Sequence, residues 1–218
     1  MLSFSNSEGA VIVEDLVKAI REHKQYLSDI DGAIGDGDHG INMNKGFTMT
    51  AEALSDEPGD LSHSLKTLGT TLMNGIGGSM GPLYGMLFRR MAKACKGAEQ
   101  IDAAVFAAML TAAREGIGSI SEAQVGDKTL VDTLFPAVDA YEKAVADGAS
   151  FADALETMKA AAVRGRDSTK DMIAKLGRSS RLGERSRGTE DAGAASCCLI
   201  LCTIADRAAA LASQPAVA

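Results

Sequence analysis

Apolar residues recur at helical spacing along this chain, whereas alternating apolar and polar runs are almost absent. The pattern is clear near the start, at Val13, Leu16, Val17, Ile20 and Leu27. Aromatic residues make up only 4% of the 218 residues, while alanine and methionine are plentiful. This composition favours closely packed helices over sheets built from aromatic and β-branched side chains. We therefore predict an all-α protein.

Glycine, proline and polar clusters divide the chain into eight predicted helices with short connections. The helices span residues 9–28, 42–55, 60–75, 80–96, 101–117, 128–147, 150–176 and 191–212. Short connections are typical of antiparallel neighbours, so we expect an eight-helix antiparallel up-and-down bundle or barrel. No linker is long enough to separate two domains, and we expect residues 1–218 to form one domain.

Four polar, glycine-rich stretches lie at every second connection of this predicted bundle. They cover residues 31–41, 74–81, 118–127 and 177–193. Connections that follow the first, third, fifth and seventh helices of an up-and-down bundle emerge at the same end. We therefore expect the four loops to meet and to form one site at a loop-rich end.

The composition also limits the partners and the compartment. A formal net charge of −7 argues against nucleic acid as a partner, because such binding depends on basic patches. The adjacent Cys197 and Cys198 point in different directions on a helix, so no disulfide framework is expected among the four cysteines. No signal-like leader follows Met1, and the apolar run 192–205 is too short to span a membrane. We expect a cytoplasmic protein without a membrane partner, with residues 192–205 in a buried helix.

The first loop places three carboxylates within eight residues, at Asp31, Asp36 and Asp38. They suit a hard cation such as Mg²⁺, which keeps several waters and commonly takes further ligands from substrate phosphates. A polar Asp-Gly turn is the alternative, since such pairs are common in turns. An EF-hand is excluded because its full pattern of acids is absent, with Ile34 at one of the required positions. His39 is expected to bind a ligand by a hydrogen bond or to cap the next helix, and a metal-binding role is the alternative.

The second loop, NGIGGSMGPLYG at 74–85, sets glycines directly before Pro82. Proline fits the first turn of a helix, and N–H groups left uncovered at a helix start suit phosphate. An ordinary turn or a tight packing contact is the alternative.

The third and fourth loops add further polar groups. In the third, Asp127 reads as a helix cap and Lys128 as a plain surface charge. The fourth carries Arg178, Arg181, Arg185 and Arg187 in an otherwise acidic chain. Clustered guanidinium groups favour phosphate or an acidic partner surface, although a charge-balanced surface loop is the alternative.

Several common nucleotide and hydrolase motifs are missing. The chain has no P-loop, no strand-linked Gly-x-Gly-x-x-Gly and no Gly-x-Ser-x-Gly elbow. Metal, glycine amides and arginine together are nevertheless the parts that phosphoryl transfer needs, because that chemistry depends on positioning and charge stabilisation. The residues alone therefore predict a helical bundle whose loop-rich end binds a Mg²⁺-phosphate compound.

Four motifs in register resemble the nucleotide-binding L subunit of dihydroxyacetone kinase. They read DGAIGDGDHGINMNKGF, GGSMGPLYG, GDKTLVDTLFPA and GRSSRLGERSRGTEDAGAAS, and the resemblance covers about residues 10–212. It implies an eight-helix antiparallel barrel with ADP or ATP capping one end through two Mg²⁺ ions.

The resemblance also implies roles for individual residues. Asp31, Asp36 and Asp38 would hold the metal ions and, with Arg178 on phosphate, serve catalysis. Leu130 would lie against the adenine. The further nucleotide contacts implied are His39, Gly40, Ile41, Asn42, Ser79, Met80, Ser121, Asp191, Ala192 and Gly193.

The chain departs from the family pattern at three places. Ser79-Met80 replaces Ala-Ser, so a hydroxyl that could meet phosphate has moved or gone. Thr189, Glu190 and Ala192 replace a segment that contains a histidine and a proline in the family, and Ser121 stands where glycine is common. These changes bear on substrate or donor preference more than on nucleotide binding.

The resemblance implies partners as well. In the family a separate K subunit holds the ketone as a covalent hemiaminal on a histidine, and the L subunit docks to deliver the phosphoryl group. The chain would therefore be a phosphotransferase active only with its K subunit. Either ATP exchanges freely, or bound ADP is rephosphorylated by a phosphotransferase-system M subunit. We also expect a homodimer. A non-catalytic regulatory subunit and a kinase subunit for another small ketose are the alternatives.

Overall fold

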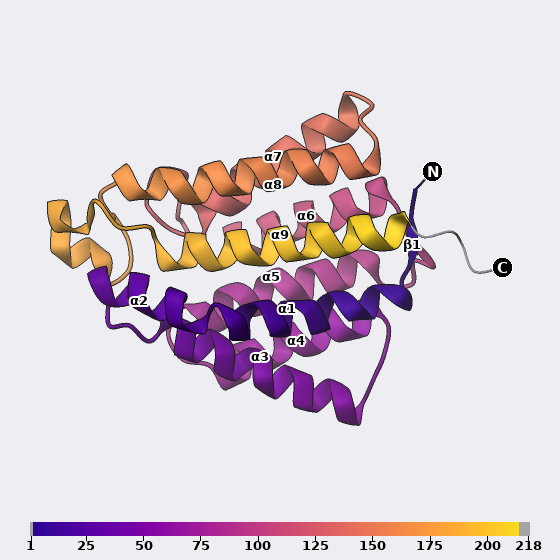
Figure 1. Ribbon diagram of the computed structural model, residues 1–218, viewed down its shortest axis with the longest axis horizontal. Helices are drawn as coiled ribbons and strands as arrows, with labels where there is room; N and C mark the ends of the chain where they lie inside the picture. The colour runs from indigo at the N-terminus through magenta and orange to yellow at the C-terminus, as the bar shows by residue number, and fades with distance from the viewer. Residues whose placement is uncertain (1, 214–218) are drawn as a thin grey trace.

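The computed structural model describes residues 2–213, and these residues form a bundle of antiparallel helices (Figure 1). The α-helices are α1 (Val11–Glu22), α2 (Lys24–Ile34), α3 (His39–Asp56), α4 (Leu61–Gly75), α5 (Met80–Cys95), α6 (Ala103–Gly118), α7 (Val131–Ala146), α8 (Phe151–Ser168) and α9 (Ala192–Ala212). Three 3-10 helices are η1 (Glu8–Ala10), η2 (Thr169–Asp171) and η3 (Ser179–Ser186). The short strands β1 (Phe4–Ser5) and β2 (Gln100–Ile101) pair antiparallel.

Eight of these helices close into a ring. From α3 to α9 each helix packs against the next along the chain, and α1 closes the ring by packing against both α3 and α9. The short helix α2 continues from α1 and packs against α3, α9 and η3. The predicted eight-helix antiparallel barrel is thus confirmed, with α2 as an added element at one end (Figure 1).

Two predicted helices are shorter than expected. The helix predicted over 9–28 is interrupted at His23, whose backbone (φ −99°, ψ 9°) departs from helical geometry and separates α1 from α2. The helix predicted over 150–176 ends at Ser168. There the hydroxyl groups of Ser168 and Thr169 donate to the carbonyls of Gly165 and Arg166. Such local hydrogen bonds compete with helix continuation.

Helix α7 also begins three residues later than predicted, at Val131. The residues before it include Gly126 (φ 100°) and Lys128 (φ 63°), which lie in the left-handed region and cannot continue a right-handed helix. The loop before α7 is therefore three residues longer than predicted.

The core lies inside the ring and is built from apolar side chains of all the helices around it. Helix α9 is long and apolar enough, by length and composition, to cross a membrane. It extends beyond the apolar run 192–205, which is too short to do so. Its side chains from Ala194 to Cys198 are nevertheless buried, as are Ile200, Leu201 and Ile204. The prediction of a buried helix in this region is confirmed.

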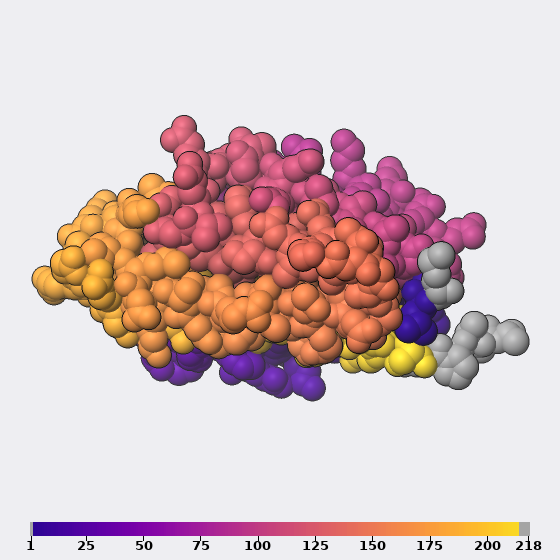
Figure 2. Space-filling model, turned by 90° about the horizontal axis from the view of Figure 1, so that it is seen from above, coloured from indigo at the N-terminus to yellow at the C-terminus, as the bar shows by residue number. Residues whose placement is uncertain are grey.

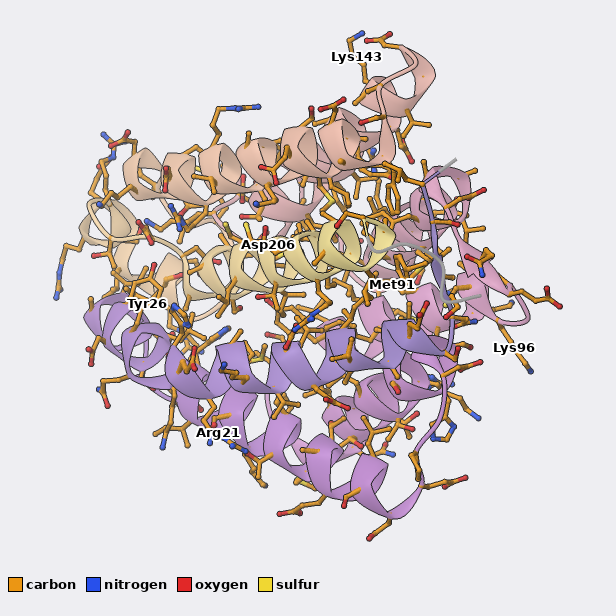
Figure 3. The ribbon with its side chains drawn as sticks, turned by 45° about the vertical axis from the view of Figure 1, so that its right-hand side comes forward. Arg21, Tyr26, Met91, Lys96, Lys143 and Asp206 are labelled. Carbon is orange, nitrogen blue, oxygen red and sulfur yellow. The ribbon has the colours of Figure 1, made fainter. Side chains whose placement is uncertain are left out.

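The two ends of the barrel differ in character. The strands and both described ends of the chain lie at one end, whereas the segment 169–190 covers the other (Figures 1 and 2). Tyr26 of α2 lies at this second end, away from Lys96 (Figure 3). Its hydroxyl donates to the Glu190 carboxylate at 2.6 Å, which joins α2 to the residues before α9.

Candidate functional site

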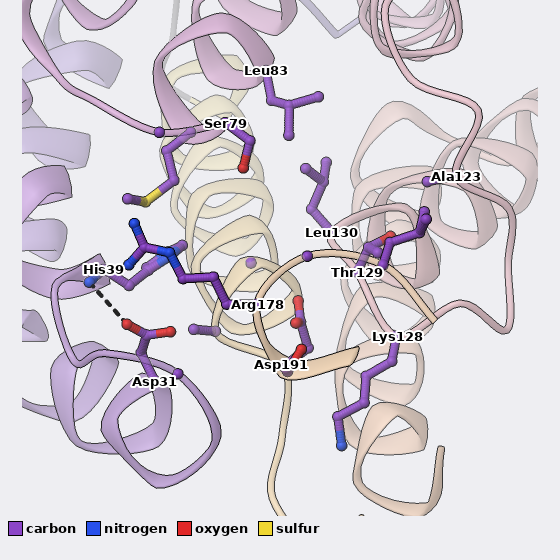
Figure 4. A pocket seen from close by; sticks show the side chains of 18 of the residues that line it. Asp31, His39, Ser79, Leu83, Ala123, Lys128, Thr129, Leu130, Arg178 and Asp191 are labelled. Carbon is purple, nitrogen blue, oxygen red and sulfur yellow. Dashed lines mark hydrogen bonds between the residues drawn. The ribbon is translucent and has the colours of Figure 1, made fainter. Parts of the chain in front are cut away.

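A cavity of about 320 Å³ opens at the loop-rich end of the barrel (Figure 4). Its lining comes from all four glycine-rich loops, and the prediction that these loops meet is confirmed. The lining includes Asp31 and Asp36 from the first loop, Ser79 from the second, Ser121 from the third and Arg178 from the fourth. The cavity therefore gathers chemical groups from segments far apart in the sequence.

The three aspartates converge on one side of the cavity. One carboxylate oxygen from each of Asp31, Asp36 and Asp38 lies within 4.8 Å of the other two. Glycine at position 35 lets the backbone pass close to Asp31, because a Cβ there would stand 2.9 Å from the Asp31 carbonyl oxygen and 2.5 Å from a carboxylate oxygen, and Gly37 has φ 76°. An Asp-Gly turn alone would not need three carboxylates aimed at one point. This donor set fits a hard divalent cation such as Mg²⁺.

Arg178 joins the fourth loop to the aspartates. Its guanidinium pairs with Asp36 and lies 3.7 Å from Asp38. It is the one arginine of the predicted cluster that lines the cavity, while Arg181, Arg185 and Arg187 are exposed. Because the Arg178 side chain is more than half exposed, its ion pair with Asp36 is weak, and another anion can replace the Asp36 carboxylate.

The second loop presents the start of α5 to the cavity. Ser79 and Met80 line it, and Pro82 lies in the first turn of the helix as predicted. Gly78 has φ 71°, and a Cβ on Gly77 or Gly78 would meet nothing within 4 Å. The backbone here is open to a ligand, which suits an anion near the free N–H groups of a helix start.

An apolar wall faces the aspartates across the cavity. Leu83 of α5 and Leu130 of the third loop point toward each other, on the side away from Asp31 (Figure 4). Ile34 and Leu176 also line the cavity. The site thus offers carboxylates and a cation at one side and an apolar surface at the other, which suits a ligand with a charged group and a flat apolar group.

The third loop corrects two expectations. Asp127 does not cap a helix: its carboxylate accepts from the Gln124 N–H at 2.8 Å and from Lys175 at 2.9 Å. Asp132, inside the first turn of α7, instead accepts from backbone N–H groups of the loop, at Gly126 and Thr129. A side chain of α7 therefore fixes the backbone of the loop that precedes this helix.

Lys128 is the second correction, because it is not a surface charge. The residue is 1% exposed. Its ammonium group lies within 3.3 Å of three backbone carbonyl oxygens of the following loop and donates to all three. Burial lowers the pKa of Lys128, and nearby Asp191 and Asp171 oppose that shift.

The start of α9 completes the lining with Asp191, Ala192 and Gly193. Asp191 is the N-cap, and its carboxylate accepts from the Ala194 N–H at 2.8 Å. Desolvation raises the pKa of Asp191 to about 7. A Cβ on Gly193 would stand 3.0 Å from the Asp191 carboxylate, so glycine lets this cap approach the helix closely.

His39 lines the cavity but points into the protein. Its Nε2 lies 2.9 Å from the Ser196 hydroxyl, which is also 2.6 Å from the Tyr84 hydroxyl, and Tyr84 donates to the Gly193 carbonyl at 3.0 Å. Burial lowers the pKa of His39 to about 4. The ring does not cap α3, whose N-cap is Asp38. The His39 backbone N–H instead donates to Asp31 at 3.3 Å.

The next three residues, in the first turn of α3, do not line the cavity. Gly40 is buried against α2, and a Cβ there would stand 2.0 Å from the Lys24 carbonyl oxygen. Ile41 is 53% exposed, and Asn42 follows it in the first turn of α3. The sequence analysis did not single out Tyr84 and Ser196, although both lie within quoted motifs, because nothing local shows that their hydroxyl groups meet across 112 residues of the chain.

Comparisons with known proteins show similarity over most of this chain. The DAK2 domain family matches residues 33–206. The ADP-binding subunit DhaL of PEP-dependent dihydroxyacetone kinase 1 from Listeria innocua is 40% identical over 189 residues, covering 86% of this chain and 89% of that protein. D-erythrulose kinase from Mycolicibacterium smegmatis is 33% identical over 195 residues, covering 88% of this chain and 33% of that protein.

A similar fold is found in the dihydroxyacetone kinase of C. freundii, whose structure was solved in complex with AMP-PNP and Mg²⁺. The TM-score is 0.66 at 21% identity, over 95% of this chain and 35% of that one. With the family match and the similarity to DhaL over most of both chains, this protein belongs to the DAK2 domain family.

Proposed function

We propose that this chain is the nucleotide-binding subunit of a dihydroxyacetone-type kinase, and that it binds ADP or ATP with two Mg²⁺ ions in the cavity. The observation that carries the proposal is the convergence of Asp31, Asp36 and Asp38 opposite an apolar wall, with Arg178 between the loops. The ADP-binding subunit named among its relatives supports the choice of nucleotide.

Each group of the cavity has a role in this proposal. The three aspartates would hold the metal ions, which when bound neutralise phosphate charge and polarise the group that is transferred. Arg178 would bind phosphate, since a guanidinium offers planar paired donors to phosphate oxygens. The open backbone at Gly77 and Gly78 would let phosphate approach the start of α5.

The apolar wall would receive the base. Leu130 is 6% exposed, so its side chain is fixed by packing before a ligand arrives. His39 would act through its backbone and through Ser196, because its ring is buried and engaged. The Ser79-Met80 replacement leaves backbone N–H groups and the Ser79 hydroxyl as the donors at this point, because Ser79 lines the cavity.

The phosphoryl acceptor would be held by another protein. Dihydroxyacetone, or another small ketose, would be bound covalently on a separate K subunit, to which this chain would deliver the phosphoryl group. The chain spans about a third of the matched erythrulose kinase and of the C. freundii enzyme, which supports acceptor binding outside this region. The PEP-dependent relative supports rephosphorylation of bound ADP by a phosphotransferase-system M subunit.

A four-carbon ketose is the second candidate acceptor, favoured by the similarity to D-erythrulose kinase. A regulatory subunit that binds nucleotide without transferring phosphate is the remaining alternative. Mixing the chain with a K subunit, a ketose that this K subunit binds, Mg²⁺ and a phosphoryl donor, either ATP or a phosphorylated M subunit, separates a kinase subunit from a regulatory one, because only a kinase subunit yields a phosphorylated ketose. The choice between the two ketoses would lie with the K subunit.

The first test is direct. The purified protein is denatured, released nucleotide is identified by chromatography, and Mg²⁺ binding with ADP or ATP is then titrated by calorimetry. Asp36→Asn should abolish Mg²⁺-dependent binding, whereas Asp29→Asn, an exposed aspartate of the preceding helix, should leave it unchanged. Equal nucleotide affinity of the wild type and Asp36→Asn would refute the proposal.

A further inference from the structure

Lys128 combines burial with an unusual backbone conformation. It is 1% exposed, and its φ of 63° makes it the one non-glycine residue with positive φ among residues 2–213. A lysine rarely adopts the left-handed region, and a buried cation loses its hydration. Both costs require compensation from the surrounding structure, so the contacts of the ammonium group decide what Lys128 does.

The ammonium group donates to three backbone carbonyls. Nζ lies 3.3 Å from the carbonyl oxygen of Met172, 2.6 Å from that of Ser186 and 2.7 Å from that of Thr189. An ammonium has three donors, so its hydrogen-bonding capacity matches these acceptors in number. No carboxylate lies within ion-pair distance of Nζ in the described part of the chain.

The three carbonyls lie on both sides of Arg178. Met172 precedes it by six residues, and Ser186 and Thr189 follow it. Two further hydrogen bonds join the beginning and the end of this loop. The Gly188 N–H donates to the Lys170 carbonyl at 2.8 Å, and the Ala174 N–H donates to the Ser186 hydroxyl at 2.9 Å. Lys128 therefore closes the base of the loop that carries Arg178 to the cavity.

The direction of the side chain agrees with this role. Figure 4 shows Lys128 extending away from Ser79 and Leu83, on the Asp191 side of the cavity. A residue in ordinary helical conformation at this position would continue α7 backwards. The left-handed conformation instead interrupts the right-handed path at this residue, and its side chain reaches the carbonyl oxygens of Met172, Ser186 and Thr189.

We propose that Lys128 is a positioning residue that clamps the loop 172–189 at its base and thereby holds Arg178 over the cavity. The phosphate-binding role of Arg178 rests on the proposed function. The hydrogen bonds from Lys128 to the loop, in contrast, are present in the protein without ligand. Lys128 would act through backbone carbonyls, not through contact with the transferred group.

The test measures opening of the loop in the protein without nucleotide or Mg²⁺. An arginine-specific protease is suitable, because Arg178, Arg181, Arg185 and Arg187 lie inside the loop and none is altered by a lysine substitution. Lys128→Met removes the ammonium group, and Lys175→Met, which removes the surface pair with Asp127, is the matched control.

Cleavage of the loop in Lys128→Met should be at least about tenfold faster than in the wild type, because hydrogen bonds from a charged donor are lost. Cleavage after the exposed Arg21 of α1 should keep its rate, which separates local opening from general loosening. Lys175→Met should behave as the wild type. ADP affinity with Mg²⁺ should fall by about tenfold in Lys128→Met alone.

Lys128→Gly keeps the proposal testable if the methionine variant does not fold, since glycine adopts positive φ without strain. It should show the same rapid cleavage of the loop. Cleavage at the wild-type rate in a folded Lys128 variant would overturn the clamp. If the wild type does not bind ADP, the proposed function fails, while the cleavage rates still decide the role of Lys128.

Discussion

Gly40 provides a sharp test of how the metal side of the cavity is built. A Cβ at this position would stand 2.0 Å from the Lys24 carbonyl oxygen and 2.6 Å from the Ser28 hydroxyl oxygen. Real Cβ contacts essentially never fall below 3.0 Å, so Gly40→Ala requires the start of α3 to move about 1 Å or more from α2. That movement separates Asp31 of α2 from Asp38, which precedes α3.

The expected loss of stability follows from two opposing effects. Overpacking against backbone costs about 1–3 kcal/mol, and the rigid carbonyl places this case near the upper limit. Alanine within a helix recovers about 0.5–1 kcal/mol relative to glycine. We therefore expect Gly40→Ala to lower the free energy of unfolding by about 2 kcal/mol, measured by urea denaturation without ligand. Mg²⁺ binding should weaken by about tenfold or more, measured by calorimetry.

Gly118→Ala is the matched control. Gly118 is the last residue of α6 at the same end of the barrel, and a Cβ there would meet nothing within 4 Å. This variant should be as stable as the wild type or more stable, by up to about 1 kcal/mol, with unchanged Mg²⁺ affinity. If Gly40→Ala matched Gly118→Ala in both measurements, the close approach of α2 and α3 would not position the aspartates.

Three further predictions concern the groups around the cavity. Arg178→Met should weaken ADP binding by about 10–100-fold but tighten binding of Mg²⁺ alone, because the guanidinium no longer competes for Asp36; titration calorimetry measures both. Burial lowers the pKa of His39 to about 4, so the unfolded chain binds a proton below about pH 6.5 that the folded protein does not, and stability should fall by up to roughly 3 kcal/mol as pH drops through that range. Urea denaturation of His39→Gln should show a shallower fall with pH. Tyr84→Phe should cost about 1 kcal/mol in thermal unfolding, because the Ser196 and Gly193 oxygens lose a buried partner.

The sequence predicted the architecture because the signals for it are local. Helical periodicity and short connections determine an antiparallel bundle, and the position of each loop along the chain determines the end at which it emerges. The convergence of Asp31, Asp36 and Asp38 could be predicted for the same reason, since glycines between them let a short backbone segment turn. Each of these inferences needed only neighbouring residues.

The missed features depend on contacts between distant segments. Lys128 was read as a surface charge because its carbonyl partners lie 44 to 61 residues further along the chain. The Tyr84–Ser196 hydrogen bond spans 112 residues. The role of Gly40 was likewise hidden, because nothing in the motif shows that α2 passes so close to it. Local patterns predict where a loop lies, but not which buried group holds it there.

The charges of the cavity bear on how many metal ions a nucleotide would need. Asp31, Asp36, Asp38 and Arg178 carry a combined charge of −2 at the metal side of the cavity. Elsewhere in the lining, the Lys128 ammonium and the Asp191 carboxyl, whose pKa is about 7, act on each other with opposite sign. One Mg²⁺ offsets the charge of the four groups at the metal side and leaves nothing for the anionic phosphates of ADP. A second ion is required for attraction, so nucleotide binding should depend on Mg²⁺ to about the second power.

This dependence is measured as the slope of log affinity for ADP against log free Mg²⁺, at concentrations where the metal sites are not yet filled and ADP is present as the free nucleotide. A slope near two is expected for the wild type. Arg178→Met provides the control, because removal of its positive charge should leave the slope unchanged while it lowers the affinity. A slope near one in the wild type would show that a single ion suffices, and that the carboxylates are neutralised in some other way.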